Sequence, residues 1–222
     1  MNNEKISKDI VLLLDEMYIQ KGEQYQDGKL VGKNAEGKFY KGVMTFMIVG
    51  IKENVPFVIK GIPGTNIEGK WLANKLDESI KSLHNIGFNI RAVISDNHST
   101  NVSAFAHLIN SFGFNKEVHG IKHPSKPELC IYLFYDSVHL IKNIRNNLLN
   151  YRRFIFPSFS FDQLYDKISW KLLHDVFDKD LARQGNLKTA PALSYKVLHP
   201  GNDKQSVPLA LGIFDRSIAV GI

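Results

Sequence analysis

The chain is poor in the features that mark secreted, zinc-rich or membrane-spanning proteins. Its 222 residues contain a single cysteine, Cys130, which excludes a disulfide framework and any cysteine-rich zinc module. Its apolar runs, such as residues 43–49, are far shorter than the roughly 20 residues that cross a bilayer. The N-terminus, MNNEKISKDI, lacks the apolar core of a secretory signal. We therefore expect a protein of a reducing intracellular compartment with no membrane partner.

The overall composition is that of a folded chain with a modest excess of positive charge. Apolar residues make up 44% and charged residues 23%, which excludes wholesale disorder. The 28 basic and 22 acidic residues leave a net charge of +6. This excess favours a polyanionic partner such as nucleic acid, but it is a weak argument alone.

Hydrophobic periodicity predicts an alternating series of strands and helices in the first two thirds of the chain. Three strands come first, the second and third forming a hairpin, and helices then alternate with two further strands. We expect Thr65 or Asn66 to cap the first helix and Gly87 to end it. The expected strands are 9–20, 42–52, 55–61, 89–95 and 130–135, and the expected helices are 67–86, 99–112 and 137–151. This order, β-β-β-α-β-α-β-α, indicates an α/β fold with a ribonuclease H-like mixed sheet.

The pattern changes after Phe154, so we place a domain boundary there. Residues 8–154 form the expected sheet-containing core, and residues 155–222 show no convincing strand alternation. Helical spacing returns at residues 161–176 and again at 210–220. We expect a second, helical region over 155–222.

Three aspartates lie where strands end or are interrupted. Asp15 interrupts the most apolar strand, and Asp96 and Asp136 each follow a strand directly. Carboxylates that meet at neighbouring strands repel each other, and a divalent metal ion relieves that repulsion. Two such ions can promote phosphodiester chemistry. The alternative is that Asp96 and Asp136 cap the helices that follow them, an explanation that does not apply to Asp15.

Three segments carry a resemblance to a known family. The stretches LLLDEMYI (12–19), VISDNHSTN (93–101) and YDSVHLIKNIRNNLL (135–149) resemble, in this order, the catalytic core of P-element transposases and their THAP9-type relatives. The resemblance implies a ribonuclease H-like fold and a DDE-type acidic triad that cuts and joins DNA with Mg²⁺ or Mn²⁺. It implies Asp15 and Asp96 as catalytic metal ligands, with Asp136 in a supporting role. It further implies transposon ends and target DNA as partners, a homo-oligomer or a full-length transposase as a protein partner, and a nuclear location.

Two departures from the family pattern limit what this chain is expected to do. The family's third acid is a downstream Glu, but Glu128 is the last Glu of this sequence. The family also carries a helical GTP-binding insertion, and residues 192–222 resemble only its opening. We therefore expect a fragment that is inactive by itself, and we expect GTP binding of the full-length family but not of this chain. The alternatives are a non-catalytic transposase-derived factor that binds DNA or protein, and a stand-alone nuclease that uses Asp136.

The helix expected over 137–151 carries candidate DNA contacts. Lys142, Arg145 and Asn146 have the spacing of one helix face, and His139 precedes them. Cations there could hold the DNA backbone without reading its sequence. The alternative is an ordinary solvated helix face.

One further motif, GTNIEGK over residues 64–70, has the spacing of a phosphate-binding loop. Trp71 follows it where a hydroxyl side chain would be needed to meet Mg²⁺. We interpret the segment as a helix entry instead.

Overall fold

The computed structural model describes residues 8–27, 29–52, 55–115, 120–158, 162, 164–183 and 188–221. The chain divides into two compact units, Met1–Asp136 and Ser137–Ile222. The sequence predicts the boundary later, between residues 154 and 155, but helix α3 (Ser137–Tyr151) contributes Leu148 to the core of the second unit. The two units are described separately.

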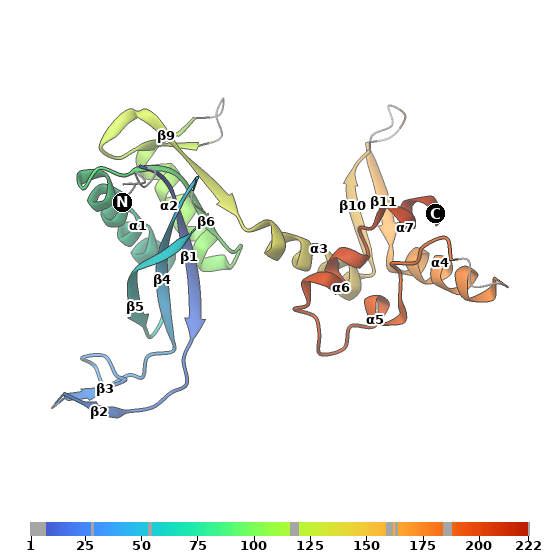
Figure 1. Ribbon diagram of the computed structural model, residues 1–222, viewed down its shortest axis with the longest axis horizontal. Helices are drawn as coiled ribbons and strands as arrows, with labels where there is room; N and C mark the ends of the chain where they lie inside the picture. Colours follow the sequence, from blue (N-terminus) through green and yellow to red (C-terminus); the bar gives the residue numbers. More distant parts are fainter. Residues whose placement is uncertain are drawn as a thin grey trace, which may run out of the picture. The chain divides into compact units, whose positions relative to one another are not determined.

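The N-terminal unit is built on a seven-stranded mixed sheet (Figure 1) with the order β5-β4-β1-β6-β9-β8-β7. Strands β5, β4 and β1 are antiparallel neighbours, whereas β1, β6 and β9 run parallel. The strands are β1 (Asp9–Tyr18), β4 (Gly42–Gly50), β5 (Pro56–Gly64), β6 (Asn89–Ser95), β7 (Phe114–Asn115), β8 (Gly120–His123) and β9 (Lys126–Tyr135). The predicted α/β class and ribonuclease H-like strand order are confirmed.

Two helices pack on one face of this sheet, α1 (Gly69–Asn85) and α2 (Ser99–Phe112). In β1, the alternate residues Ile10, Leu12 and Leu14 are buried beneath them, as the two-residue period of a strand requires. Leu72 and Leu76 of α1 are fully buried in the same core. Burial of these side chains fixes the register of β1, because a slip of one residue would turn them away from the helices.

Asp15 lies on the other face of β1 and is exposed. The sequence indicates a buried central strand, and the interior position of β1 in the sheet agrees with that expectation. Asp15 itself is exposed, because only one face of β1 is packed against the helices. The side chain of Asp15 therefore carries no burial cost.

Two short hairpins lie in segments for which the sequence predicts no strand. β2 (Gln24–Gln26) pairs with β3 (Lys29–Val31) in the polar segment after β1. β7 and β8 form an antiparallel pair at the edge of the large sheet. Both hairpins are built from polar or very short runs, which have no readable hydrophobic period.

The C-terminal unit combines helices with a hairpin. β10 (Arg153–Pro157) and β11 (Tyr165–Ser169) pair in antiparallel fashion, so the expectation of helix from residue 161 is wrong for β11. Helix α4 (Trp170–Ala182) begins after Ser169, whose Oγ accepts a hydrogen bond from Leu172 N. Three short helices follow: α5 (Tyr195–Leu198), α6 (Val207–Gly212) and α7 (Arg216–Gly221). Among the described residues, no helix is both long enough and apolar enough to span a membrane.

Candidate active site

The register of the parallel strands brings two of the three aspartates to the same level of the sheet. Leu12 of β1 is paired with Val93 of β6, and Leu13 is paired with Ile94. Asp15 lies two residues after Leu13 within β1, and Asp96 lies two residues after Ile94, directly beyond the last residue of β6. Both aspartates therefore lie near the end of the parallel pairing between the two strands.

The third aspartate extends the same row. Ser95 of β6 is paired with Tyr135 of β9, the last residue of that strand. Beyond the strand ends, the backbone N–H of Asp136 donates a hydrogen bond of 2.8 Å to the carbonyl oxygen of Ser95. Asp136 therefore follows β9 at the level where Asp96 follows β6. Its alternative role as the cap of α3 stays open.

Side-chain alternation places Asp15 on the face of β1 that is turned away from α1 and α2. Leu12 points into the core beneath these helices. Leu13 therefore points to the opposite face, and Asp15, two positions further on, shares its side. Asp96 lies beyond the end of β6, so this alternation does not extend to it, and its Oδ1 contacts Asn101 of α2.

Asp96 is held by its own loop. Its Oδ1 accepts hydrogen bonds from His98 N at 2.9 Å and from Asn101 Nδ2 at 2.7 Å. Asn101 lies in the first turn of α2 and is only 5% exposed. Asn101 is a site residue beyond those expected from the sequence, in which its place five residues after Asp96 in VISDNHSTN is the available signal.

The donor atoms fit a hard divalent ion, since Mg²⁺ and Mn²⁺ prefer carboxylate oxygens. Asp15 and Asp96 would be the ligands, with Asp136 next to them. In the part of the chain that the structure describes, no three His, Cys, Asp or Glu side chains cluster as a complete metal site. The site as it stands therefore rests on a pair of aspartates.

The predicted DNA-contacting face of α3 is only partly available. Arg145 is fully buried, and its Nη2 donates a 2.7 Å hydrogen bond to the carbonyl oxygen of Lys204. Its assignment as a DNA contact is wrong, because a side chain closed off from solvent cannot reach a phosphate. Asn146 Nδ2 contacts the same carbonyl oxygen at 3.4 Å. His139 and Lys142 are partly exposed and stay predictions.

The phosphate-loop motif has a structural explanation. Helix α1 begins at Gly69 after Glu68, so the expected cap at Thr65 or Asn66 is wrong. A β-carbon on Gly69 would fall against the side chain of Ser103 and 3.0 Å from Ala104 N in α2. The glycine therefore permits close packing of α1 on α2, which agrees with the interpretation as a helix entry.

Comparisons with known proteins agree with this architecture. Residues 1–109 match the family model described as "TNP-like, RNase H N-terminal domain". The structure is similar to a chain of the "Drosophila P element transposase strand transfer complex", with a TM-score of 0.75 and 20% sequence identity over 97% of this chain. The match spans 44% of the length of the Drosophila chain. No curated protein matches the sequence. Residues 1–109 thus resemble the TNP-like RNase H N-terminal domains, and the chain shares the ribonuclease H-like fold of the Drosophila P element transposase.

Proposed function

We propose that the N-terminal unit is the core of a DDE-type cut-and-paste DNA transposase, in which Asp15 and Asp96 hold a divalent ion for DNA cleavage and strand transfer. One observation carries the proposal: the parallel register of β1 and β6 reaches Leu13 and Ile94, each of which lies two residues before an aspartate. The likeness in fold to a P element transposase supports it.

When bound, Mg²⁺ or Mn²⁺ would activate the attacking oxygen and stabilise the leaving oxygen at a phosphodiester. The residues of the chain hold the two carboxylates in place. Asn101 and the backbone N–H of His98 fix one carboxylate oxygen of Asp96, which limits the rotation of that side chain. Asp15 lies in a strand whose core face is anchored by Leu12 and Leu14, so its backbone cannot shift without losing that packing.

Further properties belong to the same proposal. Transposon ends and target DNA are the substrates, and the positive net charge favours their phosphates. Lys142 and His139 are the remaining candidate contacts on α3. The protein partner is another copy or a full-length transposase, and the location is the nucleus. GTP binding is proposed only for a chain that carries the whole insertion.

Metal-dependent DNA binding tests the proposal. We expect Mn²⁺ to raise the affinity for a fluorescent DNA duplex, measured by anisotropy against a metal-free control, because the ion links the carboxylates to a phosphate. Asp15→Asn and Asp96→Asn should each abolish the metal effect. Asp9→Asn is the matched control, since Asp9 lies at the opposite end of β1 and pairs with Arg91. An equal effect of Mn²⁺ in all three variants would overturn the proposal.

The lack of a Glu after Glu128 favours a second function, that of a non-catalytic binding protein. No Glu follows Glu128 in the sequence, so the third acid of the family is not among residues 129–222. The chain would then bind DNA or a full-length transposase without cutting. DNA affinity combined with an absence of nicking is the outcome that supports this second function.

A further inference from the structure

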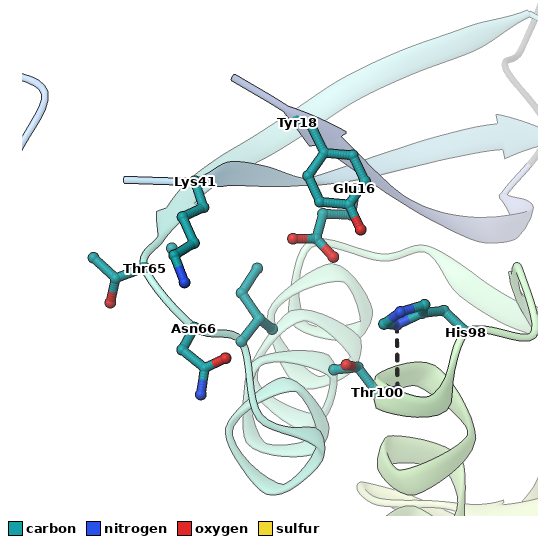
Figure 2. Close-up of a pocket in the computed structure, with 9 residues that line it drawn as sticks. Glu16, Tyr18, Lys41, Thr65, Asn66, His98 and Thr100 are labelled. Carbon is teal, nitrogen blue, oxygen red and sulfur yellow. Dashed lines mark hydrogen bonds between the residues drawn. The ribbon is translucent and has the colours of Figure 1, made fainter. Parts of the chain in front are cut away.

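A polar pocket lies next to the aspartates, on the helix-bearing side of β1. It has a volume of about 160 Å³ and lies between β1, the segment that joins β5 to α1, and the start of α2. Figure 2 shows Glu16 and Tyr18 on one side, Lys41 and Asn66 on another, and His98 facing them from the loop after β6. Glu16 directly follows Asp15, so the two carboxylates point to opposite faces of the strand.

Backbone hydrogen bonds define the rim of the pocket. Ile19 N donates to Lys41 O at 3.0 Å, and Lys41 N donates to Gly64 O at 2.9 Å, so backbone hydrogen bonds tie its rim together. Gly42 leaves the space that the Glu16 carboxylate occupies, because a β-carbon there would lie 2.8 Å from Glu16 Oε1. The carboxylate therefore has a defined place.

The lining groups offer hydrogen bonds that the described chain does not use. No hydrogen bond or ion pair joins the side chain of Glu16, Lys41 or Asn66 to another described residue. The pocket thus presents a carboxylate acceptor, an ammonium donor and an amide. Tyr18 is 75% exposed, so its ring is available for stacking, and Ile67 adds an apolar wall.

The combination of a carboxylate, an ammonium group and an amide favours a ligand that carries both hydrogen-bond donors and acceptors. A phosphate group alone is disfavoured, because Glu16 would repel it. The Watson–Crick edge of a nucleobase presents donors and acceptors side by side, and unpaired bases are commonly stacked on aromatic rings. Guanine fits best, since its adjacent N1–H and N2 amine can both donate to one carboxylate while its O6 accepts from Lys41.

We propose that this pocket binds an unpaired guanine base of the DNA strand that passes over the aspartates. The inference rests on the proposed function for its DNA substrate. A DNA strand that crosses the carboxyl end of β1 would place a phosphodiester on the Asp15 side and a neighbouring base on the Glu16 side. Recognition of that base would add sequence preference to phosphate contacts that carry none.

Titration with free nucleotides in EDTA tests the pocket without metal or cleavage. We expect dGMP to shift the amide NMR signals of Glu16, Asn66 and Ile67, and to bind about tenfold more tightly than dTMP. Glu16→Gln should remove most of this preference. Gly42→Ala should do the same, because it displaces the Glu16 carboxylate without changing charge. Glu78→Gln, on the exposed surface of α1, is the control that keeps the preference.

Two results would overturn the inference. One is the absence of shifts at these amides with dGMP at about 10 mM, a concentration that detects even millimolar binding. The other is equal binding of dGMP, dTMP and deoxyribose 5-phosphate, which would indicate a sugar-phosphate site. Failure of the proposed function has a different signature, the loss of metal-dependent DNA binding, because the nucleotide titration does not require Asp15 or an ion.

Discussion

Leu13 of β1 and Ile94 of β6 are register partners in a parallel pair, and each lies two residues before an aspartate. This register brings Asp15 and Asp96 to the same end of the parallel pair, with Asp15 in β1 and Asp96 directly after β6. The acidic pair is thus a consequence of strand register. Packing of Leu12 and Val93 against the helices holds that register in place.

Because no Glu follows Glu128, we predict that this chain does not nick DNA by itself. A pair of aspartates supplies only part of the ligand set that holds two ions for phosphodiester chemistry. We expect no conversion of supercoiled plasmid to the open-circular form in Mg²⁺ or Mn²⁺ beyond the protein-free control. Nicking that disappears in Asp15→Ala would show instead that another Asp takes the place of the missing Glu.

Arg145 is predicted to act in stability and not in DNA binding. Arg145→Ala removes a large buried side chain and its hydrogen bond to Lys204 O, and it should lower the free energy of unfolding by about 2–3 kcal/mol. Arg145→Met keeps most of the volume and removes a buried charge, so we expect a change within about 1 kcal/mol. Urea unfolding measures both.

Measurements of DNA affinity distinguish a role of Arg145 in stability from a role in DNA binding. Arg145→Met should leave the affinity unchanged, whereas Lys142→Ala should lower it. A loss of DNA affinity in a fully folded Arg145→Met variant would restore Arg145 as a contact residue.

His123 is predicted to make folding sensitive to mild acid. Its ring is buried, and burial together with the nearby His84 and Lys126 holds its pKa below the ordinary value of 6.5. The unfolded chain therefore takes up the proton first, so stability present above pH 6.5 falls as the pH drops through and below this value. Protonation of Nδ1 would also break the bonds that it accepts from Ser125 N and Lys126 N.

Unfolding curves between pH 7.5 and pH 5 check this prediction. His123→Gln should flatten the dependence of stability on pH, even if the variant is less stable throughout. His107→Gln is the control, because His107 is exposed on α2 and should leave the slope unchanged. An identical slope in His123→Gln and the wild type would contradict the account.

Gly69→Ala is predicted to destabilise the protein, against the usual trend. Alanine at an unstrained helical glycine normally stabilises by about 0.4–1 kcal/mol. Here the new β-carbon would meet Ser103 and the backbone of Ala104, so we expect a loss of about 1–3 kcal/mol. Combining it with Ser103→Gly should recover part of the loss in thermal unfolding experiments. A stabilised single variant would show that α1 can move away from α2 at no cost.

Sequence reasoning predicted the large elements because their signals are local. The apolar runs of β1 and β6 and the helical spacing of α1 are long enough to show their period. The hairpin β10–β11 was missed because its alternation is short and crosses aromatic residues that also suit a helix. The burial of Arg145 depends on Lys204, which is distant in sequence, so no local pattern could indicate it.

In the candidate site, too, the sequence indicates the local features but not those that depend on residues distant in sequence. Asp15, Asp96 and Asp136 could be picked out because each stands at a strand that the sequence reveals. We also expect from the sequence that they meet at neighbouring strands, but the pairing register behind that expectation leaves no local pattern in the sequence. The pocket around Glu16 was missed because Lys41 and Asn66 come from loops whose approach to β1 leaves no pattern in the sequence.

Paramagnetic broadening by Mn²⁺ tests the central claim most directly. At substoichiometric Mn²⁺, we expect the amide NMR signals of Asp15 and Asp96 to broaden together, because one ion lies between the two carboxylates. Asp15→Asn should remove the broadening at Asp96, and Asp96→Asn should remove it at Asp15, while Asp9→Asn changes neither. Broadening at Asp96 that persists in Asp15→Asn would show that the two aspartates do not share an ion, and would contradict the account.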